Sequence, residues 1–190
     1  MMDVYTTFRA RRSGMRYFIG LTTPEELSQS VTKARQQFGE AGERAIQRLE
    51  PHLTLVLPFN TDVEPAVITK QLKDAVADHE PFDVTITKVD SFRRGMYYLG
   101  VKSSKQLSTL QNKLFKLIEG DVRHQLVRDH YVFRPHVTVV SHLSDGQVRT
   151  TQSIADSLTF DPTTWTVDGI TLFRYVTDHW ERDITVPFNA

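Results

Sequence analysis

The sequence of 190 residues contains no cysteine, which excludes disulfide bonds, thiolate metal sites and a cysteine nucleophile. No apolar run approaches the ~18–20 residues of a membrane-spanning helix, and the polar N-terminus lacks the apolar core of a signal peptide. Neither sign of charge dominates, because 23 Lys and Arg residues balance 23 Asp and Glu residues, so no overall basic field indicates nucleic-acid binding. We expect a cytoplasmic protein without a membrane partner, and a monomer is the simplest expectation.

Two short stretches of the sequence resemble each other. Pro51–Val56 and Pro135–Val140 each contain a proline, then a histidine and a threonine two positions apart, among apolar residues. In an extended strand the side chains alternate between faces, so the histidine and threonine of each stretch point the same way and the apolar residues point into a core. The whole pattern is expected by chance at roughly 0.005 per chain, so two copies 84 residues apart are informative.

The segments around the two motifs repeat one order of predicted elements. A strand, a helix, a motif strand, a helix and a strand are followed by the same five elements and a final strand. The predicted strands outside the motifs are 16–21, 82–87, 96–101, 165–173 and 180–186, the last two forming a hairpin. The first predicted helix begins at residues 22–26 with a threonine cap, breaks at Gly39 and Gly42 and continues in a short helical piece, and the other helices cover 67–76, 107–118 and 144–158.

This repetition predicts a duplicated unit of about 80–90 residues. Residues 1–14 are polar and form an expected N-terminal extension, whereas residues 15–190 form a single bilobal domain. We expect the first motif lobe to cover about 22–90 and the second about 96–170, with an exchange of terminal strands between lobes allowed. The duplication would bring the motif strands to equivalent places and both histidines into one cleft.

Two facing histidines can perform paired acid–base catalysis. A neutral imidazole accepts a proton from an attacking water or hydroxyl, and a protonated imidazole donates one to a leaving oxygen. The hydroxyl groups of Thr54 and Thr138 are small fixed donors that suit the non-bridging oxygens of a phosphate between the two rings. This reaction needs no metal ion and no cofactor, and two histidines alone form an incomplete zinc site.

The two motifs carry a resemblance to a known family. His52-Leu53-Thr54-Leu55 and His136-Val137-Thr138-Val139 resemble the paired His-x-Thr-x motifs of the two-histidine (2H) phosphoesterase superfamily. Within it, the chain is similar to the LigT-like group, called 2′–5′ RNA ligases or RNA 2′,3′-cyclic phosphodiesterases. The resemblance covers roughly residues 15–188 and includes Met15–Leu21, Pro81–Val84 and Phe133–Pro135, which resemble the opening strand, the strand after the second helix and the lead-in to the second motif.

The resemblance implies an α+β fold of duplicated α/β type, bilobal and pseudo-two-fold, in which two antiparallel-rich sheets flank a central cleft and helices lie outside. It implies that His52 and His136 are catalytic and that Thr54 and Thr138 bind the substrate phosphate. The implied substrate is an RNA end or a nucleotide with a 2′,3′-cyclic phosphate, opened without a metal ion. Reversible ligation at a 2′–5′ linkage is also implied, and the assignment of acid and base stays open.

Several other residues are weaker candidates. Arg134 can bind phosphate or form a structural ion pair, and some aromatic residues can stack on a base, although core packing is favoured for most of them: Tyr17, Phe18, Phe92, Tyr97 and Tyr175. Several LigT-like proteins follow the second motif with Ala-Arg, where this chain has Val140-Ser141. The alternatives to the cyclic phosphodiesterase are a non-catalytic nucleotide- or RNA-binding module and a phosphodiesterase on a substrate other than RNA.

Overall fold

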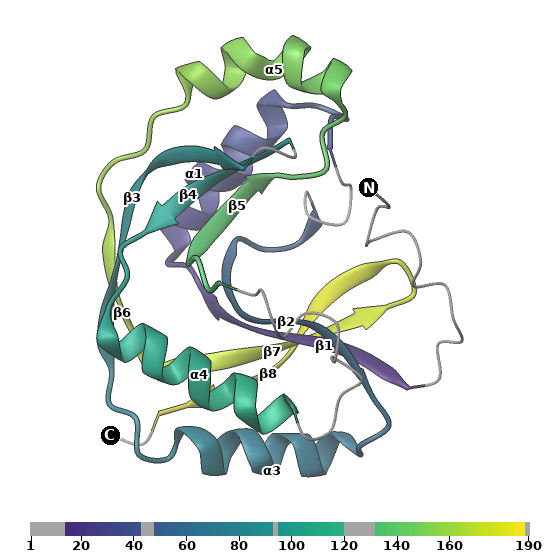
Figure 1. Ribbon diagram of the computed structural model, residues 1–190, viewed down its shortest axis with the longest axis vertical. Coiled ribbons are helices and arrows are strands. Elements are labelled where there is room, and N and C mark those ends of the chain that lie inside the picture. The colour runs from purple at the N-terminus through teal and green to yellow at the C-terminus, as the bar shows by residue number, and fades with distance from the viewer. Residues whose placement is uncertain (1–13, 43–47, 93–94, 120–131, 189–190) are drawn as a thin grey trace.

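The computed structural model describes residues 14–42, 48–92, 95–119 and 132–188 (Figure 1). In chain order its elements are β1 (Met15–Thr22), α1 (Glu25–Gln37), β2 (His52–Thr61), α3 (Pro65–Val76), β3 (Phe82–Phe92), β4 (Met96–Val101), α4 (Lys105–Glu119), β5 (His136–Val140), α5 (Asp145–Ser157), β6 (Thr164–Val167), β7 (Gly169–Val176) and β8 (His179–Pro187). The expected order of strands and helices is confirmed as far as α5, after which three strands follow where two were expected. Most of the N-terminal extension and the short helical piece after Gly42 lie outside the described residues.

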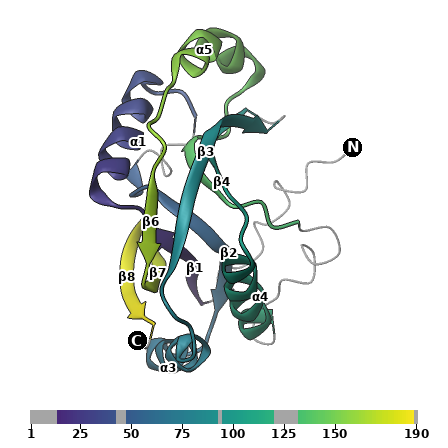
Figure 2. The same ribbon diagram turned by 90° about the vertical axis from the view of Figure 1, so that its left-hand side faces the viewer.

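All eight strands form one curled antiparallel sheet in the order β6-β3-β4-β5-β2-β1-β7-β8 (Figures 1 and 2). The two motif strands, β2 and β5, occupy its centre, and the described register joins them at a single residue pair, Leu53 and Val137. The sheet thus consists of two four-stranded halves, which correspond to the two sheets expected from the sequence. The α+β fold class is confirmed.

The two halves exchange elements along the chain. β3 follows the first motif strand in sequence but pairs with β4, in the half that contains the second motif. β7 follows the second motif strand but pairs with β1, in the half that contains the first motif. The helices cross over in the same way, because α4 packs against β2 and α1 against β5. Each motif strand is therefore supported by elements from both parts of the chain.

Two local expectations are wrong. α1 begins after Pro24 without a side-chain cap, and the hydroxyl of Thr23 instead donates to the carbonyl of Pro51, 3.1 Å away. The strand expected over 165–173 is two strands: β6 pairs with β3 at one edge of the sheet, whereas β7 pairs with β1 and β8. The break falls before Gly169, where a Cβ atom would lie 2.7 Å from the carbonyl oxygen of Val186, so the chain passes too close to β8 for a side chain.

α5 shows how the sequence sets a helix boundary. The Ser144 side chain accepts from the backbone N–H of Gln147, whose own side chain accepts from the Ser144 backbone, so this capping box fixes the first turn. Within the described ranges, no helix has the length and apolar character that a crossing of the membrane requires.

Candidate active site

The motif histidines and threonines lie on the same face of the two central strands. Their apolar neighbours are fully buried on the opposite face, as the alternation predicts: Leu53, Leu55, Val137 and Val139. Because Leu53 pairs with Val137 in antiparallel register, each histidine lies near the threonine of the other motif across the centre of the sheet. His136 is close enough that its charge lowers the pKa of His52.

Both histidines are held by the same kind of hydrogen bond. His52 Nδ1 lies 2.9 Å from the carbonyl oxygen of Glu50, and His136 Nδ1 lies 2.7 Å from the carbonyl oxygen of Arg134. A carbonyl can only accept, so each Nδ1 carries the hydrogen and each Nε2 is the nitrogen that can exchange a proton with a substrate. In each motif the acceptor is two residues before the histidine, and the two sites therefore have equivalent local geometry.

Aromatic rings flank each histidine. The rings of Phe18 and Phe173 lie 4.8 and 5.3 Å from the ring of His52, between centroids. The rings of Phe92 and Tyr98 approach His136 edge-on, at 5.5 and 5.2 Å. These four rings form two apolar walls beside the groups that would transfer protons.

The two histidines differ in burial. His52 is 7% exposed, and this burial, together with the nearby positive charge of Arg35, lowers its pKa to about 4. His136 is partly exposed, and burial lowers its pKa below the usual 6.5, against the effect of the Arg134 carbonyl. His52 is therefore neutral at pH 7.

The alternation of side chains along a strand decides which of the candidate aromatic residues lie near the histidines. Tyr17 does not reach the site: its side chain is fully buried in the core, and its hydroxyl donates to Met15 Sδ at 3.2 Å. The neighbouring Phe18 takes the face that contains His52. Tyr175 packs edge-on against Trp180, 5.1 Å between centroids, and Trp180 in turn lies 4.8 Å from Phe18. Trp180 and Phe18 thus connect Tyr175 to the ring of His52.

Arg134 and the threonines border the same face. Thr54 and Thr138 are both partly exposed there, beside the histidines of the opposite strands. Arg134 is exposed. Burial and the carboxylate of Asp90 raise the pKa of Tyr98, and the positive charge of Arg134 partly opposes this shift. Its guanidinium therefore lies near the wall beside His136, where an anionic substrate could meet it.

Sequence reasoning missed Arg35, which is 4% exposed. Its guanidinium donates to the carbonyl oxygens of Leu49, Thr138 and Val139, and burial lowers its pKa to about 10. The available signal was its place on the apolar stripe of α1, four residues after Val31. A buried arginine at such a position must find acceptors.

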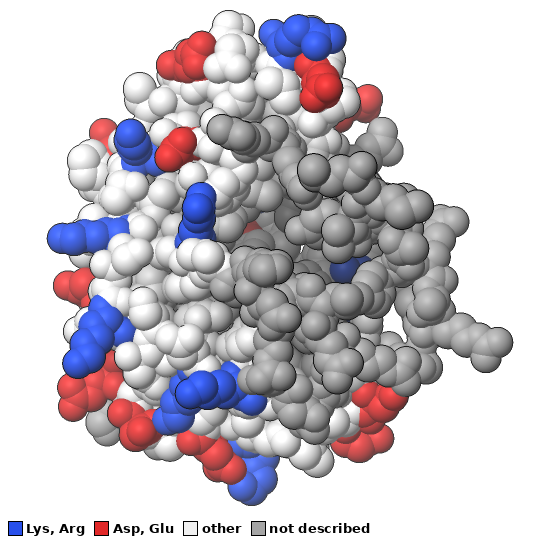
Figure 3. Space-filling model, viewed as in Figure 1, with Lys and Arg blue, Asp and Glu red and all other residues white. Residues whose placement is uncertain are grey.

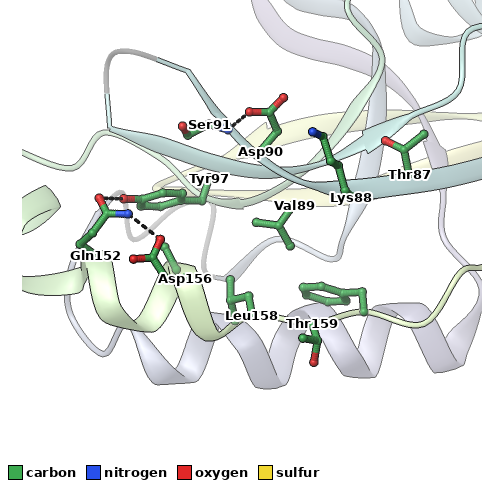
Figure 4. A pocket seen from close by; sticks show the side chains of 12 residues that line it. Thr87, Lys88, Val89, Asp90, Ser91, Tyr97, Gln152, Asp156, Leu158 and Thr159 are labelled. Carbon is green, nitrogen blue, oxygen red and sulfur yellow. Dashed lines mark hydrogen bonds between the residues drawn. The ribbon is translucent and has the colours of Figure 1, made fainter.

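A pocket of the described residues lies away from the two motifs. It has a volume of about 520 Å³, and it lies between β3 and α5, lined by residues that include Val89, Tyr97, Gln152 and Asp156 (Figure 4). The Tyr97 hydroxyl donates to Gln152 on its rim, and neither motif contributes to it. Tyr97 precedes Tyr98 on β4 and points to the opposite face of the sheet.

In the described part of the chain, charged residues and residues that can bind a metal ion form neither a patch of one sign on the face shown in Figure 3 nor a metal-binding cluster. On the face shown in Figure 3, the Lys and Arg residues of the described ranges are interspersed with Asp and Glu. Across those same ranges, no three His, Asp or Glu side chains come together in a way that could hold a metal ion.

Comparison with known proteins identifies the family. Residues 23–179 match the 2′-5′ RNA ligase superfamily. The chain belongs to this superfamily, which comprises 2H phosphoesterases. A candidate phosphoesterase of Bacillus pumilus is 32% identical over 103 residues, 52% of this chain and 56% of that protein. Another, from Bacillus licheniformis, is 26% identical over 136 residues, 70% of this chain and 75% of that protein.

Solved structures share the fold. Escherichia coli LigT complexed with 3′-AMP has a TM-score of 0.64 at 19% identity, over 94% of this chain and 100% of that one. TT0787 of Thermus thermophilus has a TM-score of 0.66 at 16% identity, over 92% of this chain and 98% of that one.

Proposed function

We propose that the chain is a phosphodiesterase that opens 2′,3′-cyclic phosphates on an RNA end or a nucleotide, with His52 and His136 as the catalytic pair. The observation that carries this proposal is the matched hydrogen bond from each Nδ1 to the carbonyl two residues earlier. It gives both rings the same tautomer and leaves two Nε2 atoms for proton transfer. Membership in a phosphoesterase superfamily supports an enzyme.

The reaction follows from the two rings. The neutral Nε2 of one histidine takes a proton from water as the water oxygen bonds to phosphorus. The bond from phosphorus to the 2′ or 3′ oxygen breaks, and the protonated Nε2 of the other histidine donates its proton to that leaving oxygen. One water is consumed, one phosphomonoester is formed, and the two rings exchange protonation states. Solvent resets them. With a 5′-hydroxyl in place of water as the nucleophile, the same sequence would break the bond from phosphorus to the 3′ oxygen, protonate that oxygen and form a 2′–5′ linkage.

The difference in burial supports one assignment of the acid and the base. His52 is packed against two stacked phenylalanine rings and is neutral at pH 7, which suits the base. His136 is more exposed, and the negative charge of a bound phosphodiester would raise its pKa and favour its protonated form as the acid. Thr54 and Thr138 would donate to the non-bridging oxygens.

The substrate class has two lines of support. The E. coli LigT structures include complexes with 3′-AMP, phosphate, NADP⁺ and ATP, and that protein shares this fold. In this chain, position 141 is a serine that is 1% exposed, so no cation follows the second motif there. We therefore favour a nucleotide or a short RNA end over a long RNA strand, and we place the reaction in the cytoplasm with a monomer as the active form.

The test is a set of substrates with EDTA present throughout. We expect turnover of a 2′,3′-cyclic mononucleotide or of an oligoribonucleotide with a cyclic phosphate end, and a loss of about 10²–10⁴-fold in kcat for the His136→Ala variant. If the protein hydrolyses bis(p-nitrophenyl) phosphate but neither cyclic phosphate, its substrate is a phosphodiester other than an RNA end or a cyclic nucleotide. Tight binding of the cyclic nucleotide without turnover would identify a binding module instead.

A further inference from the structure

Arg35 is a buried cation at the junction of the two sheet halves. Over the described ranges its partners are three backbone carbonyls: Thr138 at 2.9 Å, Val139 at 3.2 Å, and Leu49. Leu49 lies just before the first motif, and the other two residues lie within the second. One side chain from α1 thus binds the backbone of both motif segments.

The segment that leads into the first motif, residues 49–51, has three backbone carbonyls, and each of them accepts a hydrogen bond from a side chain. Leu49 O accepts from Arg35, Glu50 O accepts from His52 Nδ1, and Pro51 O accepts from the Thr23 hydroxyl. This segment precedes β2 and has no strand partner within the described register. Its position, and with it the acceptor that orients the His52 ring, therefore depends on side chains at the two ends of α1, together with Arg182 of β8, which donates to the Glu50 carboxylate.

The second motif contains an irregularity at the same place. Tyr98 pairs with Thr138 and Tyr97 pairs with Val140, so Val139 is an extra residue on β5, a β-bulge. A bulge leaves ladder groups unpaired, and a buried unpaired carbonyl destabilises the fold. The planar guanidinium has five donors in a fixed fork and can satisfy adjacent carbonyls in a way that the single ammonium of a lysine cannot.

We propose that Arg35 is a positioning residue that sets the separation of the two motif strands and thereby the relative placement of His52 and His136. The only described backbone pair between β2 and β5 is Leu53 with Val137, so the guanidinium supplies further links across this junction. Because Arg35 is buried and bonded to backbone, it acts through the histidines rather than on the substrate. The catalytic part of this proposal rests on the proposed function, whereas the structural part does not.

Two variants of Arg35 and two controls test the proposal. Arg35→Met removes the charge and the donors at similar volume, and Arg35→Lys keeps the charge but loses the fork. Lys33→Met removes an exposed charge from the same helix, and Val31→Ala weakens the packing of that helix without removing any bond to a motif carbonyl. The readouts are the ¹⁵N and ¹H imidazole resonances of His52 and His136 without substrate, the melting temperature, and kcat and KM for a 2′,3′-cyclic nucleotide.

We expect both Arg35 variants to shift the Nδ1 resonances of the two histidines and to lower kcat by roughly 10–100-fold with KM within about threefold, because misplaced catalytic groups cost rate more than binding. Lys33→Met and Val31→Ala should leave the resonances and kcat near wild type, even where Val31→Ala lowers the melting temperature. Unchanged resonances and kcat in Arg35→Lys would overturn the proposal, and this variant decides the matter if Arg35→Met does not fold. Absence of turnover in the wild type would refute the proposed function and leave the resonance test intact.

Discussion

Acid should destabilise the fold through His52. The ring is buried against Phe18 and Phe173, and burial lowers its pKa to about 4, whereas a histidine in the unfolded chain has a pKa of about 6.5. Between these values the unfolded chain binds a proton at this position and the folded chain does not. The stability that depends on the neutral ring is therefore fully present above pH 6.5, and it is lost as the pH falls from 6.5 to about 4.

The size of this loss follows from the difference between the two pKa values. At about 1.4 kcal/mol per pH unit, the lowering to about 4 corresponds to about 3 kcal/mol of unfolding free energy. A typical domain has about 5–15 kcal/mol in total, so the effect should be easy to measure. Below pH 4 both states bind the proton, and the contribution of His52 stops changing.

The assay is urea unfolding from pH 4 to pH 8 for the wild type and for His52→Asn. Asparagine places an amide nitrogen near the position of Nδ1 and can still donate to Glu50, but it does not titrate. We expect the free energy of unfolding of the wild type, relative to the variant, to fall by about 3 kcal/mol from pH 7 to pH 4. A relative change under about 1 kcal/mol would refute the reasoning, because a ring that ordinary solvent reaches titrates alike in both states.

Three further predictions concern the site and its support. Thr54→Val and Thr138→Val should each lower kcat for a 2′,3′-cyclic nucleotide by roughly 10–100-fold at an unchanged melting temperature, because the isosteric change removes a hydroxyl donor to the phosphate; rates within threefold of wild type would exclude this role. The profile of kcat/KM against pH should show an acid limb near pH 4, from His52, and a maximum on the acid side of pH 6.5, because the pKa of His136 is also lowered; an acid limb at 6.5 would contradict the buried base. Gly42→Ala should lower the free energy of unfolding by about 2 kcal/mol or more in urea titrations, because φ is +85° and a Cβ would lie 2.5 Å from Val140 Cγ2. Gly39 has a φ of +58° and open space around it, so the control variant Gly39→Ala should lower the free energy of unfolding by only about 1 kcal/mol.

The sequence predicted what depends on local periodicity. Alternation along the strand was enough to put His52 and Thr54 on one face and Leu53 and Leu55 in the core. The repeated order of elements was enough to predict two equivalent motif strands. These properties require only the residue types within one segment.

Properties that depend on pairing between distant segments were not predictable. Phe18 rather than Tyr17 faces His52 because of the register of β1 with β2 and β7, and a local sequence pattern does not determine this register. The break before Gly169 reflects the approach of β8, a contact made only in the folded chain. Arg35 was missed because its acceptors lie up to 104 residues away in sequence and are backbone atoms, which have no side-chain signature.

The most direct test of the account is turnover of a 2′,3′-cyclic nucleotide in the presence of EDTA by His52→Ala, His136→Ala and the double variant. If the two rings act on one phosphorus atom in one step, each single variant should lose about 10²–10⁴-fold in kcat. The double variant should lose no more than about tenfold beyond the slower single variant, because a base without its acid contributes little. Turnover within threefold of wild type in either single variant, with the same substrate, would contradict the paired mechanism.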